Sequence, residues 1–158
     1  MLRRPIDFHA RVRGHRLFGD SKTWRGVFVA VLGSIVAVAL QRAIGHVVPA
    51  AIQIVDYAKV DPVSFGAAMG GGAMLGELPN SFVKRQVGIA PGATARGWKA
   101  AVFYVWDQVD LLTGVWPAIL LWVRPSGLLV AGSFAVALLV HPLVALVGYA
   151  IGARRSRR

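Results

Sequence analysis

The sequence predicts an all-α integral membrane protein, a bundle of about four transmembrane helices with cytoplasmic N- and C-termini. Of its 158 residues, 56% are hydrophobic and 16% are charged, whereas a soluble domain carries about 25% charged residues. The apolar residues form four runs, each close to the ~20 residues that a helix needs to cross a ~30 Å hydrocarbon layer. The lysines and arginines gather outside these runs. A chain of this length is expected to form a single domain.

Few charges interrupt the four predicted spans. The spans cover residues 27–45, 63–83, 100–123 and 128–152. The first holds Arg42, the second holds Glu77, the third holds Asp107 and Asp110, and the fourth holds no charge. Residues 1–25 are expected to form a cytoplasmic segment that is not a signal peptide, because they lack an apolar core of about 7–15 residues.

Positive charge is distributed unequally between the two predicted sides of the membrane. Fifteen Lys and Arg residues lie in the first 25 residues, the loop 84–99 and the tail, against three on the opposite side. The positive-inside rule therefore places both termini and this loop in the cytoplasm. The net charge of +11 is then a topology signal and an attraction to anionic headgroups, and no nucleic-acid partner is expected. The absence of cysteine excludes disulfides and thiolate metal sites.

Glycines are concentrated in the second predicted span. Gly66 with Gly70, and Gly72 with Gly76, form small-xxx-small pairs, which let helix backbones approach closely. The pairs predict tight packing, either within the bundle or across a homodimer. A nucleotide-binding glycine loop is the alternative, but no strand precedes the run and the GxGxxG pattern is not matched.

Three carboxylates lie inside predicted spans, where each would cost roughly 2.5–3.5 kcal/mol at a helix centre. Asp107 and Asp110 are three residues apart, so a helix places both on one face with Cβ atoms about 5–6 Å apart. Two like charges this close favour a divalent cation, and Mg²⁺ takes a few carboxylates with phosphate oxygens and water. Glu77, seven residues before Lys84, is expected at the depth of Asp107, eight residues after Lys99. The alternative is a pair of interfacial carboxylates hydrogen-bonded to their neighbours.

Polar side chains accompany Glu77 along the second span. Helical spacing puts Glu77, Ser81 and Arg85 on one face, with Asn80 and Lys84 beside it. This grouping favours a functional face, while the alternative makes the two cations simple interfacial anchors.

A third polar cluster, residues 17–26, precedes the first span. Asp20 or Ser21 is expected to cap the helix, and a helix N-terminus beside Lys22 and Arg25 favours anions. It is not a Walker A loop, which would need glycine at positions 16 and 21. The alternative is a capped, positively flanked membrane helix. All three clusters are predicted on the cytoplasmic side, where a lipid phosphate could meet a nucleoside triphosphate.

Three blocks of sequence carry a family resemblance: LFGDSKTWRG at 17–26, GELPNSFVKRQVGIAPG at 76–92 and DQVDLLTG at 107–114. In these blocks the chain resembles the CDP-archaeol synthase family, relatives of the CDP-diacylglycerol synthases. The resemblance implies a membrane-embedded, Mg²⁺-dependent cytidylyltransferase domain over residues 1–158. Such an enzyme joins CTP to an archaetidic or phosphatidic acid-like lipid phosphate and releases pyrophosphate. Family members look like five-helix proteins with one more helix ahead of the first block. Glu77 stands where many of them have Asp, and Pro79–Asn80 departs from a more basic pattern, so the lipid is left open.

The resemblance and the clusters together give each candidate residue a role. Asp107 and Asp110 are expected to hold Mg²⁺, with Glu77 as a weaker third ligand. The cations expected to hold the triphosphate or the lipid phosphate are Lys22, Arg25, Lys84 and Arg85, of which Lys22 and Arg25 are assigned mainly to CTP. The hydrogen-bond donors expected for substrate are Thr23, Asn80 and Ser81. Two alternatives use the same carboxylates: a small membrane ion or proton carrier, and a non-catalytic membrane scaffold.

Overall fold

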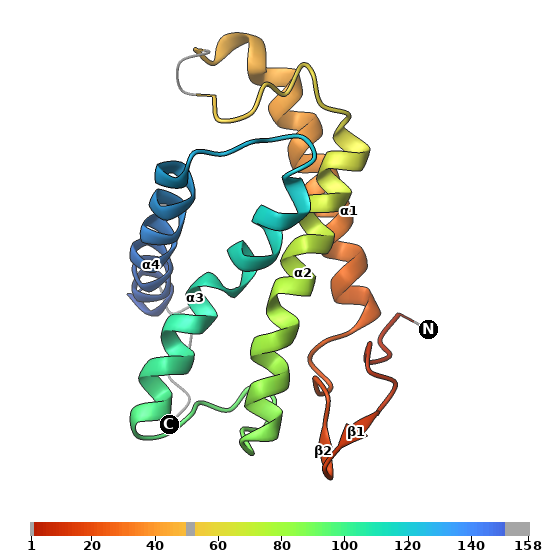
Figure 1. Cartoon of the computed structure of the whole chain (residues 1–158), viewed down its shortest axis with the longest axis vertical. Coiled ribbons are helices and arrows are strands. Elements are labelled where there is room, and N and C mark those ends of the chain that lie inside the picture. Colours follow the sequence, from red (N-terminus) through yellow and green to blue (C-terminus); the bar gives the residue numbers. More distant parts are fainter. Residues whose placement is uncertain (1, 50–52, 151–158) are drawn as a thin grey trace.

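The computed structural model describes residues 2–49 and 53–150, and within them the chain is dominated by four long helices (Figure 1). A short hairpin comes first. The elements are β1 (Arg11–Val12), β2 (His15–Arg16), α1 (Trp24–Ile44), the 3-10 turn η1 (Gly45–Val47), α2 (Pro62–Gln86), α3 (Trp98–Ile119) and α4 (Gly127–Ala150). Each helix overlaps one predicted span, and α3 ends four residues before the end predicted for the third span. The last two residues of the fourth span and the basic tail lie outside the described residues.

The N-terminal hairpin is an element that the sequence analysis did not predict. β1 and β2 pair antiparallel, with Val12 opposite His15. Arg13 and Gly14 connect them with φ angles of 52° and 82°, the left-handed conformation that a two-residue type I′ turn requires at both positions. Strands of two residues are too short to show an alternating pattern, so only the turn could have indicated them.

Local capping fixes where the first two long helices begin. The Thr23 hydroxyl accepts a hydrogen bond from the Gly26 N–H at 3.2 Å, so the cap of α1 is Thr23 rather than the expected Asp20 or Ser21. At α2, the Asp61 carboxylate accepts the Ser64 N–H at 2.8 Å. Pro62 follows at the first helical position, where its missing N–H costs nothing.

Helix α2 lies at the centre of the bundle and packs against α1 on one side and α3 on the other. Glycines make both approaches close. A Cβ atom at Gly66 would lie 2.5 Å from the Ile35 Cα, and one at Gly70 would lie 2.6 Å from the Val31 Cα, both on α1. The first glycine pair therefore packs within the bundle.

The second glycine pair faces α3. A Cβ atom at Gly72 would lie 2.6 Å from the Gly114 carbonyl oxygen, and one at Gly76 would lie 2.7 Å from the Gly114 nitrogen. Helices of the same chain thus cover both pairs. The homodimer alternative gains no support from these glycines.

The main apolar cluster and the buried polar residues occupy opposite ends of the bundle. The apolar cluster lies near the 45–61 connection and consists of Val38, Val55, Val60, Phe65, Val115 and Ile119. The buried polar residues are Asp7, Asn80, Ser81, Arg85 and Asp110. Phe65 and Arg85 mark the two ends on α2, about 30 Å apart at ~1.5 Å per residue. The hairpin and the 87–97 connection lie at the polar end (Figure 1).

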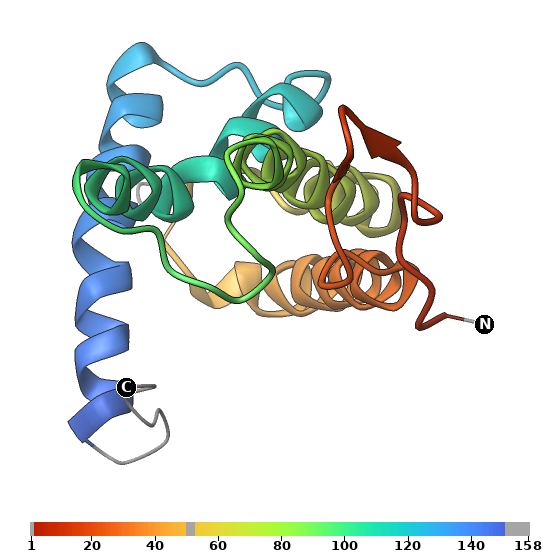
Figure 2. The ribbon, with the colours of Figure 1, turned by 90° about the horizontal axis from the view of Figure 1, so that it is seen from below.

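The outer surface of the bundle is apolar, with large hydrophobic side chains exposed along α1, α3 and α4. Helix α4 packs against α3 alone among the described elements. It lies at the edge of the bundle, as the view from below shows (Figure 2). Among the described residues, only α1 is a helix long and apolar enough to cross a membrane by length and composition; a shorter apolar stretch covers Gly127–Val140. α2 and α3 carry the polar side chains of the interior.

Candidate active site

Asn80 links α2 to the acidic pair of α3. Its side-chain nitrogen donates to Asp107 Oδ1 at 2.5 Å and to Asp110 Oδ2 at 2.8 Å. Asn80 is 2% exposed and Asp110 is 9% exposed, whereas the side chain of Asp107 is 45% exposed. The structure therefore brings the two predicted carboxylates together on one amide, with one carboxylate buried and the other open to the surroundings.

The oxygen atoms of this cluster are of the kind that a hard divalent cation takes as ligands. Two carboxylates converge on one point, and the buried Asn80 Oδ1 has no hydrogen-bond partner in the structure. Mg²⁺ prefers oxygen ligands of these kinds and keeps further positions for water or phosphate. Within residues 2–49 and 53–150, no group of three His, Cys, Asp or Glu side chains is close enough to hold a metal ion. The third predicted ligand, Glu77, is thus not gathered with the aspartate pair.

Two lysines form ion pairs with the carboxylates. Lys84 donates to Asp107 and lies 5.5 Å from the centre of the Phe103 ring. Lys22 donates to Glu77, which joins the segment before α1 to the middle of α2. The Lys22–Glu77 pair is partly buried, where charge interactions are stronger than in water, whereas the Lys84–Asp107 pair is exposed on its Asp107 side. The ion pairs tie α1, α2 and α3 together at the polar end.

Arg85 is 9% exposed, and no Asp or Glu in the described part of the chain pairs with it. Its Nη1 donates to the Ile89 carbonyl, and its buried Nε has no partner. The loop of the first sequence block lies against it, because a Cβ atom at Gly19 would be 3.5 Å from Arg85 Cδ. A buried guanidinium that has no carboxylate partner is a favourable binding site for an anion such as phosphate.

The remaining predicted residues divide between the cluster and the surface. Ser81 is buried beside Asn80 on α2, whereas the Thr23 hydroxyl caps α1. Arg25 is exposed and lines a shallow surface hollow with Arg3. The structure therefore leaves Thr23 and Arg25 outside the cluster.

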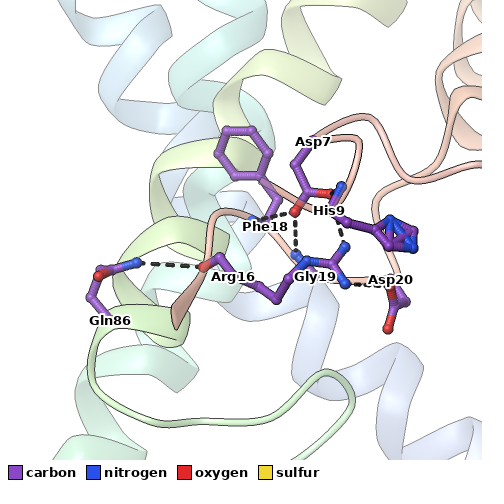
Figure 3. Close-up of polar contacts among 7 residues, drawn as sticks. All are labelled: Asp7, His9, Arg16, Phe18, Gly19, Asp20 and Gln86. Carbon is purple, nitrogen blue, oxygen red and sulfur yellow. Dashed lines mark hydrogen bonds and ion pairs between the residues drawn. The ribbon is translucent and has the colours of Figure 1, made fainter. Parts of the chain in front are cut away.

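Asp7 organises the loop that leads to Lys22, and the sequence analysis missed it (Figure 3). Its carboxylate accepts hydrogen bonds from the N–H groups of His9, Phe18 and Gly19 at 3.1, 3.1 and 3.2 Å. Arg16 Nη2 donates to the same carboxylate at 2.8 Å. Burial by itself raises the pKa of Asp7, but these four hydrogen bonds outweigh it and hold the pKa well below its usual range.

Arg16 connects this network outward. Its Nη1 donates to the exposed Asp20 at 2.9 Å, and its carbonyl oxygen accepts from Gln86 Nε2 of α2 at 3.4 Å. The hairpin fixes the position of Arg16, so Asp7 could not be found without knowing the hairpin. A buried carboxylate that accepts two consecutive backbone N–H groups also sets the conformation of the 17–23 loop.

An apolar outer surface around an internal, charged site defines the class of this protein: a helical membrane protein with a polar site at one end of its bundle. A family model described as CarS-like CDP-archaeol synthase matches residues 3–156, and the chain belongs to this family. The resemblance seen in the three sequence blocks is thereby confirmed.

Three known proteins illustrate the similarity. The CDP-archaeol synthase of Halobacterium salinarum is 40% identical over 112 residues, which are 69% of this chain and 55% of that protein. That of Methanopyrus kandleri is 33% identical over 155 residues, 92% of this chain and 75% of that protein. A solved structure of an intramembrane enzyme for archaeal membrane lipid biosynthesis matches with a TM-score of 0.68 and 26% identity, covering 91% of this chain and 80% of that one.

These similarities indicate that the chain is embedded in a membrane. The chain spans about half the length of the Halobacterium relative.

Proposed function

We propose that this chain is a CTP-dependent cytidylyltransferase that converts a lipid phosphate to a CDP-lipid and releases pyrophosphate. The observation that carries the proposal is the Asn80 cluster. It places Asp107 and Asp110 on one amide, with Lys84 paired to Asp107. Membership of the family supports the same activity. The lipid phosphate is archaetidic or phosphatidic acid-like.

Asp107 and Asp110 would hold Mg²⁺ through the carboxylate oxygens that accept hydrogen bonds from the Asn80 amide in this structure. Bound there, Mg²⁺ would neutralise phosphate charge and orient the phosphate oxygens. Glu77 stays a weaker candidate because Lys22 already pairs with it.

Side chains of the protein would bind the two substrates and neutralise the charge of their phosphates. In the proposed reaction, an oxygen of the lipid phosphate attacks the α-phosphorus of CTP, and the bond from that phosphorus to the bridging oxygen breaks to release pyrophosphate. Lys84 and Arg85 would bind phosphate oxygens, and fixed cations stabilise the charge that develops on the leaving group. Three carboxylates and three cations, Lys22 included, balance one another before substrate binds.

Transfer of label from CTP to organic-extractable lipid tests this function directly. Membranes that contain the full chain, supplied with Mg²⁺, labelled CTP and a lipid phosphate, are expected to form labelled CDP-lipid and pyrophosphate. If proton or ion flux depended on the protein while no label entered lipid, the carrier alternative would replace this proposal.

We also propose that four helices cross the membrane with the polar end in the cytoplasm. The hairpin and the 87–97 connection lie at one end, and both carry predicted cytoplasmic charge. The chain has no cysteine, so single reporters can be introduced at Thr94 and Ala58. Impermeant thiol reagent added to intact cells is expected to label Ala58→Cys and to spare Thr94→Cys. The reverse pattern would invert the orientation, and labelling of both would contradict the number of crossings between them.

Asp7→Asn is expected to loosen the loop ahead of Lys22. The asparagine loses the charge-assisted bond to Arg16, and such bonds contribute roughly 1.5–3 kcal/mol. Amide hydrogen exchange over residues 17–19 should therefore speed up by about 10- to 150-fold. Because the folded pKa of Asp7 is lowered, its charged form stabilises the fold above the ordinary pKa. That contribution disappears as the pH falls toward the folded value.

Asp20→Asn is the matched control for this change. It removes an exposed partner of the same arginine, and exposed ion pairs contribute little. Equal exchange rates in the two variants would show that Asp7 does not order the loop.

A further inference from the structure

A groove of about 430 Å³ opens between the segment that starts α1 and the middle of α2. Its polar end is the ion pair of Lys22 with Glu77. Ser21 and Thr23 also line it, and its other walls are apolar, formed by side chains that include Phe18, Trp24, Val27, Met74, Leu75 and Leu78. Leu75 is 65% exposed, so the groove is open to the surroundings of the bundle.

The groove follows the direction in which the helices cross the bundle. Gly71 also lines it and lies six residues before Glu77, which is about 9 Å along α2. Phospholipids lie with their phosphate at the membrane surface and their chains along the membrane normal. A chain that starts beside Lys22 would therefore extend along α2 toward Gly71.

The chemistry of the groove matches a lipid phosphate and not a nucleotide. A cytosine ring and a ribose need hydrogen-bond partners when they leave water, but beyond the ion pair only Ser21 and Thr23 carry polar side chains and the remaining walls are apolar. A hydrocarbon chain gains free energy from the same walls. Lys22 has three N–H donors, and one goes to Glu77, so donors remain for a phosphate at the open end.

We propose that this groove seats the first part of one hydrocarbon chain of a lipid phosphate, and that Lys22 binds its phosphate. The identity of this ligand as the substrate rests on the proposed function. The assignment differs from the sequence-based expectation that Lys22 serves mainly CTP. It leaves two cations for the triphosphate: Lys84, which pairs with Asp107, and Arg85, which lies against the loop at Gly19.

Photocrosslinking tests the groove without requiring activity. A lipid phosphate with a diazirine near the start of one chain is incorporated into membranes that contain the full chain. After irradiation, the label is expected on residues of the groove, above all Met74 and Leu75. Unlabelled lipid phosphate should compete, and Gly71→Leu should reduce the cross-link. Label confined to α4 or to the outer face of α1 would overturn the proposal.

Measurement of the KM for each substrate provides a second test of the groove, with a matched control variant. A Cβ atom at Gly71 meets nothing within 4 Å, so Gly71→Leu fills the groove without displacing a helix. The KM for lipid phosphate is expected to rise about tenfold, as for the lost burial of about two methylene groups, while the KM for CTP stays unchanged. Gly33→Leu adds the same side chain at an equally open position of α1 outside the groove and should leave both constants unchanged.

Lys22→Ala separates the two substrates. Loss of a charge-assisted hydrogen bond predicts a rise of about 10- to 150-fold in the KM for lipid phosphate. A rise in the KM for CTP alone, in this variant or in Gly71→Leu, would overturn the assignment. Cross-linking of the groove without any transfer from CTP would reject the proposed function and still support the groove. The cross-link on the unmodified chain decides the question even where a variant fails to fold.

Discussion

Asp110→Asn is expected to reduce cytidylyl transfer to the background of empty membranes. The change keeps the shape of the side chain but removes one of the two charges that converge on Asn80. A bound metal ion contributes several kcal/mol to a phosphoryl-type transition state, which corresponds to a loss of about a thousandfold or more. Asp107→Asn should have an effect of the same kind, and it also frees Lys84 from its partner. The measurement is the rate of label transfer at saturating CTP.

Asp56→Asn is the control for both variants. Asp56 is an exposed carboxylate near the opposite end of the bundle, where it pairs with Lys59 on the surface. Transfer by this variant should match that of the unmodified chain, and all three proteins should be recovered in the membrane fraction. Full activity in either site variant would remove that aspartate from the metal site.

Gly114→Ala is expected to separate α2 from α3 and to inactivate the protein. A Cβ atom at position 114 would lie 2.5 Å from the Gly76 nitrogen and 2.7 Å from its Cα. Both are backbone atoms that no rotamer change can move, so the helices must shift apart. Asn80 is one helical turn beyond Gly76 and would be drawn away from the aspartate pair. A misplacement of about 1 Å can cost about 100-fold in rate, and overpacking costs about 1–3 kcal/mol in stability.

Gly33→Ala supplies the comparison, because a Cβ atom there meets nothing within 4 Å. Its thermal unfolding temperature in detergent and its transfer rate should equal those of the unmodified chain. If Gly114→Ala kept both the unfolding temperature and the transfer rate of the unmodified chain, the close contact between α2 and α3 would not determine the geometry of the site.

Hydropathy predicted the four helices: each predicted span coincides closely with an α-helix of the structure. The i, i+3 spacing of Asp107 and Asp110 also predicted that these two side chains share a face of α3. The helical spacing of Glu77, Asn80 and Lys84 did the same for α2. These are local relations, which a helical period determines. The choice of ion-pair partners was not predictable in this way. Lys22 pairs with a residue 55 positions away, and that distance depends on how closely glycines let α1 approach α2.

Asp7 shows a second limit of sequence reasoning. Its role depends on a hairpin of two-residue strands and on the loop that returns Phe18 and Gly19 to it. None of these has a hydrophobic period. The groove also depends on tertiary structure, since its two walls come from segments about 50 residues apart in the chain.

The uneven polarity of the helices has a consequence for how the protein enters the bilayer during its synthesis. Among the described helices, α1 is apolar enough to partition into lipid on its own length and composition. α2 and α3 bring three carboxylates with them, each unfavourable in hydrocarbon until it is neutralised. Lys22 and Lys84 neutralise two of them, Glu77 and Asp107, and the third, Asp110, accepts a hydrogen bond from Asn80 of α2. We therefore expect α1 to insert first, and α2 and α3 to leave the translocation machinery as a charge-compensated pair rather than one by one.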